Sequence, residues 1–541
     1  QYEFLAYTNQ LMTSRKRAKE IFSFYRELIP QLPSYKQLVF ENKLLILENY
    51  MTGELDNLIR LLLQLELGQS FNSDRLKQAL QMFMISLPVY RIYPEELPLR
   101  GRDMAILNQT FEKAATQKPD LKPEFDYFRA LFSSKTFTSE HDQNVLTFLQ
   151  RLMQFTGPLT AKGVEDTTFY VYNALLSHDE VGDSPGTLGM SIATFHQTMS
   201  ERLQNNALSL NATSTHDTKR GEDARLRLNA LCEFADQWKA CVKKWIASNK
   251  KFRSKTASGK VAPELNDEYY IYQAIAGGFP EDLEIADEWI ERVLAYYTKA
   301  LREAKVNSDW SAPDAAYEEA CHSFIRSILK PGSEFLDVLE PLLKKIILRA
   351  NHYSMAQALL KITAPGIPDI YQGCELWDLS FADPDNRRPV DYDKRINLLS
   401  ALESKEEQGQ AILFSYLEDM RAVGIEKLFV IRKSLHFRKS HSQLFTVGSY
   451  IPLQITGKEA IAIAYARKFN DQWALIAAPL SVRSNGAKDP ADVRDTDEII
   501  LPEGCPSLWF NVLTGDRIQS QGRLSLSDVF NRFPVALLKG E

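Results

Sequence analysis

Three patterns in the sequence predict an α/β fold. Apolar residues recur at helical spacing through much of residues 1–150 and 221–350. Residues 151–220 and 351–423 instead contain short apolar segments that end in glycine, proline and aspartate clusters, and the pattern from about Gly424 onward is typical of strands. Strand-then-helix units followed by a β tail predict part of a (β/α)8 TIM barrel with large all-α insertions and a C-terminal antiparallel β domain.

The helical prediction depends on apolar stripes. One stripe runs through residues 44–65 at spacings of three and four, which predicts one buried face of an amphipathic helix. Ser73 and Asp74 precede a second stripe and resemble a helix cap. A third stripe, over residues 283–297, falls in the second helical segment. The three stripes contain Leu44, Leu47, Met51, Leu55, Leu58, Leu62 and Leu65; Leu76, Ala79, Leu80 and Phe83; and Leu283, Ala286, Ile290, Val293, Leu294 and Tyr297.

The strand prediction depends on a few short segments. Leu208–Thr215 is predicted as a buried strand with His216 and Asp217 at its C-terminal end. Residues 353–395 are predicted as helix, short strand and long polar loop. Ile461–Tyr465 and Trp473–Ala477 flank Asn470-Asp471, which predicts a β-hairpin. Leu508–Val512 and Val535–Leu538 are predicted as further strands.

Composition restricts the class of protein. The net charge of -6 and the pI near 5.9 disfavour binding to nucleic acid or to an anionic membrane. No apolar run approaches the ~18 residues needed to cross a bilayer, and no signal peptide opens the chain, so we expect a cytoplasmic location. The five cysteines are scattered without CxxC spacing, and the eight histidines show no metal-binding spacing. We therefore expect reduced thiols, no metal and no cofactor.

The first candidate site is the segment Thr213–Arg220. It places His216, Asp217, Lys219 and Arg220 at the end of a predicted barrel strand, where barrel enzymes build active sites. A carboxylate there can stabilise an oxocarbenium-like transition state. The alternative is that Asp217 caps a helix and that the two cations are solvated.

Two further segments carry candidate binding residues. In the segment 156–170, Lys162, Glu165 and Tyr170 could orient a sugar, or could belong to a loop with surface ion pairs. In the segment 365–389, Asp383 and Arg387 could bind vicinal hydroxyls, or each other, through bidentate contacts. In the same segment Trp377 could stack on a pyranose ring, and Glu375 is a further candidate for binding substrate. Lys219 and Arg220 of the first segment are also predicted to bind substrate. The alternative for this segment is a rigid, salt-bridged loop.

Together these segments resemble a known family. His216-Asp217 after a strand and GIPDIYQGCE (366–375) are similar to two signatures of the α-amylase-type glycoside hydrolases. The strings AKGVEDT (161–167), STHDTKR (214–220), NDEYYIYQ (266–273), ELWDLSFADPDNRRPVD (375–391) and FPVALL (533–538) resemble the maltooligosyl trehalose synthase branch of that family. The resemblance covers most of the chain. Cys374 differs from the threonine that is usual in the family.

The resemblance implies an activity and residue roles. The family moves the reducing-end glucose of a maltooligosaccharide from an α-1,4 to an α,α-1,1 linkage. Asp217 would stabilise charge at the reacting ring, and His216 would bind its hydroxyls. Asp383 and Arg387 would bind the glucose at or next to that ring, and Lys162, Glu165 and Tyr170 would hold the sugar on the other side of the scissile bond.

The resemblance also implies a domain order and a missing part. It predicts a helical insertion domain (1–150), a barrel segment with strands six and seven (151–220), a second helical insertion (221–350), a segment with strand eight and the substrate loop (351–423), and a C-terminal β-sandwich (424–541). The nucleophilic Asp and the acid/base Glu of the family lie upstream of the matching segment, and their signatures do not occur in this chain. We therefore expect this chain alone to be inactive, because it has no group to form the covalent intermediate.

Three hypotheses follow for the function. The chain is part of the enzyme, either shortened or one of two chains, in which case its partner is the N-terminal part of the barrel. Alternatively, it is a non-catalytic glucan-binding or scaffolding protein derived from the family. A third possibility is a related α-glucan hydrolase or transferase.

Overall fold

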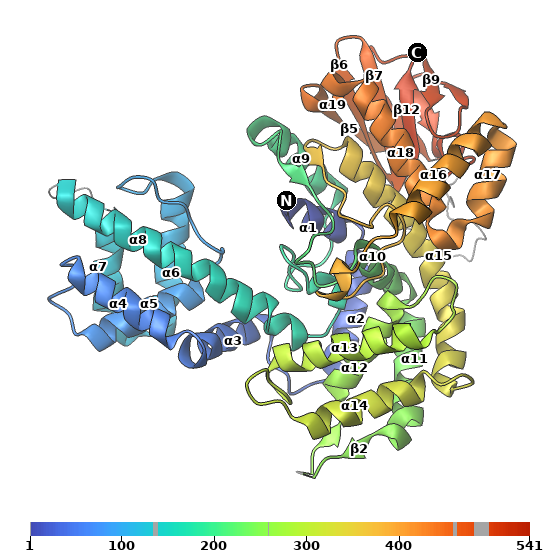
Figure 1. Cartoon of the computed structure of the whole chain (residues 1–541). Helices are drawn as coiled ribbons and strands as arrows, with labels where there is room; N and C mark the ends of the chain where they lie inside the picture. The colour runs from blue at the N-terminus through green and yellow to red at the C-terminus, as the bar shows by residue number, and fades with distance from the viewer. Residues whose placement is uncertain (1, 134–138, 258, 458–461, 481–496) are drawn as a thin grey trace. The chain divides into compact units, whose positions relative to one another are not determined.

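The computed structural model describes residues 2–541 apart from 134–138, 258, 458–461 and 481–496 (Figure 1). The described chain is mostly helical, with a β region at its C-terminal end. It divides into two compact units. The first contains Gln1–Pro30, Asn173–Lys299 and Asp314–Glu541, and the second contains Gln31–Tyr172 and Ala300–Pro313.

The second unit is a helical bundle. Its core contains many aromatic and aliphatic side chains, among them Leu62, Phe83, Phe111 and Phe148, each fully buried. The π-helix η2 (Ala161–Glu165) and the 3-10 helix η3 (Thr168–Tyr170) follow the last long helix. The long helices are α3 (Tyr35–Asn49), α4 (Thr52–Gln64), α5 (Ser73–Ser86), α6 (Gly101–Gln117), α7 (Lys122–Ser133) and α8 (Ser139–Thr160).

The apolar stripe over residues 44–65 is divided between two helices, α3 and α4, so the prediction of one helix was wrong. The hydroxyl of Thr52 donates to the carbonyl oxygen of Glu48 at 2.6 Å, and the N–H groups of Tyr50 and Met51 both donate to that of Ile46. These bonds satisfy the last carbonyls of α3 and end it. The stripe itself is buried at Leu47, Leu55, Leu58 and Leu62.

The cap of α5 is also one residue earlier than predicted. The helix begins at Ser73, but the side chain of Asn72 accepts hydrogen bonds from the N–H groups of Asp74 and Arg75. Asn72 therefore caps the helix, because asparagine fits the N-cap position as well as serine does.

The first unit contains a buried set of helices. Every residue of α10 (Glu222–Leu231) is buried, as is most of α12 (Leu265–Gly278) and the second half of α15 (Glu334–Thr363). The other helices are α1 (Tyr2–Leu11), α2 (Arg15–Leu28), α9 (Ile192–Asn205), α11 (Ala235–Ser248), α13 (Asp287–Ala304, which ends in the second unit), α14 (Ala315–Ile328), α16 (Tyr392–Glu407), α17 (Gln410–Asp419), α18 (Ile425–Ser440) and α19 (Ser442–Thr446).

A short parallel pair of strands lies in the first unit. β1 (Leu210–Asn211) pairs with β4 (Ile367–Pro368), with Leu210 opposite Ile367. A Cβ atom at Gly366 would lie 2.1 Å from Oδ1 of Asn211, so the approach of the two chains requires glycine there. The predicted strand is present, but it is shorter than Leu208–Thr215, and Leu208 is 70% exposed. The strand prediction was therefore correct only for Leu210–Asn211, and the predicted burial only for residues 211–215.

The C-terminal strands form one eight-stranded antiparallel sheet, which confirms the predicted antiparallel β region (Figure 1). Its order is β10-β9-β12-β7-β6-β5-β8-β11. The strands are β5 (Ser449–Ile455), β6 (Ala462–Phe469), β7 (Gln472–Pro479), β8 (Glu498–Ile500), β9 (Leu508–Asn511), β10 (Arg517–Gln519), β11 (Arg523–Ser525) and β12 (Ala536–Gly540), and a short helix α20 (Leu526–Val529) follows β11. The predicted domain bounds and the sandwich form stay predictions.

The predicted hairpin is confirmed. Phe469 pairs with Gln472 across a two-residue turn, and Asn470 adopts the left-handed conformation with φ of 52°. Ile461, at the start of the predicted first strand, lies outside the described residues. The β region begins later than predicted, because α18 and α19 occupy most of residues 425–446. Within the described part of the chain, no helix has the length and apolar composition that crossing a bilayer requires.

Candidate functional site

The loop after β1 exposes the two residues that the sequence singled out first. Nε2 of His216 lies 3.1 Å from Oδ2 of Asp217, and their side chains are 61% and 52% exposed. The N–H of Asp217 donates to the hydroxyl of Thr215 at 3.1 Å, which fixes the turn. Helix α10 begins only at Glu222, with Gly221 at its N-cap. Asp217 is therefore not a helix cap, and the alternative interpretation of this residue was wrong.

A second loop, residues 381–389, lies beside the first. The N–H of Gly221 donates to the carbonyl oxygen of Ser380 at 2.8 Å. The side-chain amide of Asn386, which is 8% exposed, donates to the carbonyl oxygens of Thr215, His216 and Thr218 at 3.2–3.4 Å. These contacts join two segments that are about 170 residues apart in the sequence.

The two loops bring four predicted residues together: Asp217, His216, Asp383 and Arg387, called the Asp217 cluster below. Nη2 of Arg387 lies 3.5 Å from Oδ1 of Asp217 and 3.8 Å from Oδ2 of Asp383. The guanidinium also donates to the carbonyl oxygen of His216 at 3.1 and 3.3 Å. Asp383 and Arg387 are 39% and 45% exposed. The cluster thus presents two carboxylates, an imidazole and a guanidinium fork to solvent.

Three other predicted residues of this unit lie in different surroundings. Arg220 is 4% exposed, and its guanidinium donates to the carbonyl oxygens of Leu176 and Asp179 in the interior. Lys219 is 8% exposed, so neither cation is solvated as the alternative supposed. Glu375 pairs with Arg395, whose Nε lies 3.0 Å from Oε2. The structure thus places the guanidinium of Arg220 apart from the Asp217 cluster.

Trp377 is also bound into the fold. Its indole N–H donates to the carbonyl oxygen of Arg421 at 2.8 Å, and its side chain is partly buried. The ring is therefore held in one orientation by the segment before α18.

The remaining predicted residues belong to the second unit. Nζ of Lys162 lies 2.6 Å from Oδ2 of Asp166, and the lysine side chain is 58% exposed. Glu165 is 8% exposed and accepts a hydrogen bond from the hydroxyl of Tyr90, and Tyr170 is 4% exposed. Lys162 and Glu165 both lie on the π-helix η2, and such helices occur often at functional sites.

Comparisons with known proteins identify the relatives of this chain. It is 31% identical over 389 residues to a Mycobacterium tuberculosis protein that is provisionally named as a maltooligosyl trehalose synthase. The match covers 72% of this chain and 45% of the relative. The structure matches maltooligosyltrehalose synthase from Arthrobacter ramosus over the whole of this chain, with a TM-score of 0.80 and 27% identity. The chain is related to the maltooligosyl trehalose synthases.

The extent of the match differs between this chain and its relatives. The chain spans about half the length of the curated relatives and covers 63% of the Arthrobacter chain. A Sulfolobus tokodaii protein described as a hypothetical maltooligosyl trehalose synthase also matches over the whole of this chain, with a TM-score of 0.71, 25% identity and 62% of its own length covered. No protein-family model matches the sequence.

This relative of the maltooligosyl trehalose synthases also contains a buried ion cluster that the sequence did not predict. It consists of Glu222, Asp223, Lys361 and Lys427, each at most 4% exposed. Nζ of Lys427 lies 2.7 Å from both carboxylates, and Nζ of Lys361 lies 3.1 Å from Glu222 and 2.8 Å from the hydroxyl of Thr213. The cluster therefore fixes the segment that leads from β1 to Asp217.

The charges of this ion cluster compensate each other. Burial by itself would raise the pKa of Glu222, but Lys361 and Lys427 more than offset it and hold that pKa below its usual range. Burial would likewise lower the pKa of Lys427, but Asp223 and Glu222 raise it instead. One signal was present in the sequence: Lys361 and Lys427 each stand within an apolar helical stretch, where a lysine needs a buried partner.

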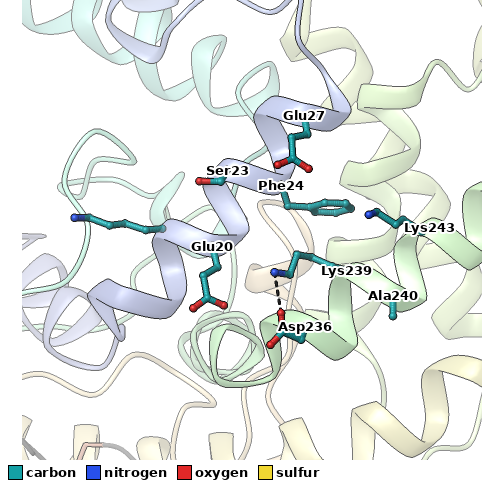
Figure 2. A pocket seen from close by; sticks show the side chains of 9 residues that line it. Glu20, Ser23, Phe24, Glu27, Asp236, Lys239, Ala240 and Lys243 are labelled. Atoms are coloured by element: carbon teal, nitrogen blue, oxygen red, sulfur yellow. Dashed lines mark ion pairs between the residues drawn. The ribbon is translucent and has the colours of Figure 1, made fainter.

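A separate hollow of about 550 Å³ lies between α2 and α11 (Figure 2). Its wall carries charges of both signs, and Lys239 pairs with Asp236 at 2.9 Å. None of the predicted site residues lines it. Among the described residues, no group of three or more His, Cys, Asp or Glu side chains is placed to hold a metal ion.

Proposed function

We propose that this chain forms part of an enzyme that moves the reducing-end glucose of a maltooligosaccharide from an α-1,4 to an α,α-1,1 linkage, a step that makes the trehalose end of the product. The observation that carries this proposal is the Asp217 cluster. It brings together four residues that the family resemblance assigns to the reacting glucose, although they come from two loops that are far apart in the sequence. The relationship to maltooligosyl trehalose synthases supports the substrate class.

In this proposal β1 and β4 are strands seven and eight of a (β/α)8 barrel. The two strands are parallel and adjacent, and the loops after both carry the cluster. Active sites of such barrels are built from the loops at the C-terminal ends of the strands, which is where these loops lie. Strands one to five belong to the N-terminal part of the barrel, which is the partner that we propose for this chain.

The proposed chemistry divides the work between the two parts. The N-terminal part provides the nucleophilic Asp, which forms a glucosyl ester, and the Glu, which protonates the leaving oxygen and later deprotonates the attacking hydroxyl. Asp217 stabilises the positive charge that develops at the ring between these steps. His216, Asp383 and Arg387 hold the ring hydroxyls, because imidazole, carboxylate and guanidinium groups provide both donors and acceptors.

The three predicted residues of the second unit have a proposed role on the other side of the scissile bond. Lys162, Glu165 and Tyr170 hold the glucose that leaves and then returns through its anomeric hydroxyl. Keeping that glucose bound allows it to turn so that its anomeric hydroxyl attacks the glucosyl ester and displaces the carboxylate, whereas its escape would let water react instead. The fixed π-helix that carries Lys162 and Glu165 suits this holding role.

The experiment compares the chain alone with the chain produced together with the N-terminal part of the barrel. Each sample is incubated with maltopentaose, and the reducing ends and the products are measured. We expect a non-reducing product of unchanged chain length only when both parts are present. Glucose and shorter reducing chains as the main products would instead identify a hydrolase or transferase. Turnover by the chain alone would overturn the proposed division of work, and binding without any turnover in the combined sample would indicate a glucan-binding protein.

A further inference from the structure

Helix α13 is bound to the loop that carries Asp383 and Arg387. Nζ of Lys299 lies 2.6 Å from Oδ1 of Asp383 and donates to the carbonyl oxygen of the same residue at 2.9 Å. About two turns earlier on the helix, the guanidinium of Arg292 makes two hydrogen bonds to Asp385, at 2.7 and 2.9 Å. Two cations of one helix thus hold two acids of one loop.

The two ion pairs differ in the surroundings of their carboxylates: Asp385 is bound within its own loop, whereas Asp383 faces the Asp217 cluster. The carboxylate of Asp385 is 11% exposed and accepts the N–H of Phe381 at 2.8 Å, so the Arg292 pair shapes the loop itself. Burial would raise the pKa of Asp385, but Arg292 offsets it and the pKa is lowered. Asp383 is more exposed, at 39%, and its second oxygen faces Arg387 of the Asp217 cluster.

Lys299, Asp383, Arg387 and Asp217 form a row of alternating charge. The first contact in the row is 2.6 Å, and the next two are 3.8 and 3.5 Å. A charge-assisted hydrogen bond holds Asp383 firmly to Lys299, whereas Arg387 makes only loose contact with the carboxylates on its two sides. Without Lys299, Asp383 would be free to close on Arg387 and form the bidentate pair that such side chains prefer. The guanidinium of Arg387 would then be unable to bind the sugar or to contact Asp217.

We propose that Lys299 is a positioning residue for the glucose-binding pair: it holds Asp383 so that Asp383 and Arg387 do not neutralise each other and both remain available to the substrate. This inference rests on the proposed function. It also gives a role in the active site to the second predicted helical insertion, residues 221–350. Lys299 acts through Asp383 and not by touching the reacting ring.

The test uses the complete enzyme that contains this chain, with maltopentaose as substrate. Lys299→Met keeps the length of the side chain but removes the charge. We expect KM to rise about 3-fold to 5-fold, with kcat and the melting temperature nearly unchanged, which corresponds to the loss of one partly exposed ion pair. Lys299→Arg, which can still hold Asp383, should restore KM to within about 2-fold of the wild type.

Two controls separate positioning from folding. Arg326→Met breaks an exposed pair with Glu291, 2.7 Å apart, and should change neither KM nor melting temperature. Arg292→Met breaks the more buried pair on the same helix and should lower the melting temperature. In the Asp383→Asn background, Lys299→Met should have no further effect on KM, because its partner is already neutral.

Three outcomes would overturn the inference. One is a melting temperature that falls in Lys299→Met while the KM of the folded enzyme is unchanged. Another is an effect on KM that adds fully to that of Asp383→Asn. The third is a wild-type enzyme that neither binds nor converts maltopentaose, which would remove the proposed function as well, whereas the first two outcomes leave it standing.

Discussion

Two clusters of charged residues include side chains from the segment after β1, and they differ in exposure and in the lengths of their ion pairs. The buried ion cluster of Glu222, Asp223, Lys361 and Lys427 is at most 4% exposed and is held by contacts of 2.7–3.1 Å. The Asp217 cluster is 39–61% exposed, and its ion pairs with Arg387 measure 3.5 and 3.8 Å. Buried charges have no water to replace a lost partner, whereas exposed charges exchange partners readily. The first group is therefore suited to holding the fold, and the second to binding a ligand.

The largest expected effect is on the buried side of this comparison. Lys427→Met leaves Glu222 and Asp223 buried with one cation fewer, so we expect the free energy of unfolding to fall by about 3–5 kcal/mol. Urea denaturation of the folded protein measures it. The matched control is Lys344→Met, whose pair with Glu340 is 60% and 53% exposed and should contribute less than about 1 kcal/mol. If both variants unfold alike, the buried cluster does not stabilise the fold.

Substitutions in the exposed Asp217 cluster should lower activity but leave the free energy of unfolding nearly unchanged. Asp217→Asn in the complete enzyme keeps the shape of the side chain but removes the charge that, in the proposed function, faces the reacting ring. We expect kcat to fall on the order of 10²–10³-fold. Because Asp217 is half exposed and caps no helix, the free energy of unfolding should change by less than about 0.5 kcal/mol. A fully active Asp217→Asn enzyme would show that the cluster is not catalytic.

A buried histidine, His196, extends the comparison to the pH dependence of stability. His196 is 7% exposed, its Nδ1 lies 2.7 Å from the hydroxyl of Tyr450, and burial lowers its pKa from 6.5 to about 4. Between these two pH values, His196 is protonated in the unfolded chain but neutral in the folded chain. Stability due to neutral His196 is therefore present above pH 6.5 and is lost as the pH falls toward 4.

The size of this effect can be measured with two variants. We expect His196 to account for about 1–2 kcal/mol of the stability lost between pH 7 and pH 5, so that His196→Asn shows a correspondingly smaller loss over this range. His216→Asn is the exposed counterpart: its ring is 61% exposed, so the free energy of unfolding at pH 7 should change by less than about 0.5 kcal/mol. Equal slopes in the wild type and His196→Asn would contradict the prediction.

The smallest expected effect tests whether the exposed pair binds sugar or locks its loop. Arg387→Ala should raise the KM or dissociation constant for maltooligosaccharides about 5-fold, as the loss of one exposed charged contact predicts. The melting temperature should hardly move. If it drops by several degrees while the affinity of the folded protein is unchanged, Arg387 is a structural residue, and the two clusters differ less than we infer.

The sequence by itself determined the local structure wherever a short-range rule was sufficient. The two-residue turn at Asn470-Asp471 specified the hairpin of β6 and β7, because asparagine tolerates the left-handed conformation that the turn requires. Helical spacing located the buried stripe that includes Leu47 and Leu62. The resemblance of separate motifs also predicted that Asp217, His216, Asp383 and Arg387 serve one site, and the structure places the four together.

Only the tertiary structure decided where each charge lies. Lys219-Arg220 reads as a solvated pair in the sequence, yet the guanidinium of Arg220 is buried among backbone carbonyls. Glu222 and Asp223 look like ordinary acids at the start of a helix, and their lysine partners come from α15 and α18, more than 130 residues away. Local patterns record the spacing of side chains along one element. Whether a charge is solvated or paired depends on which distant element packs against it.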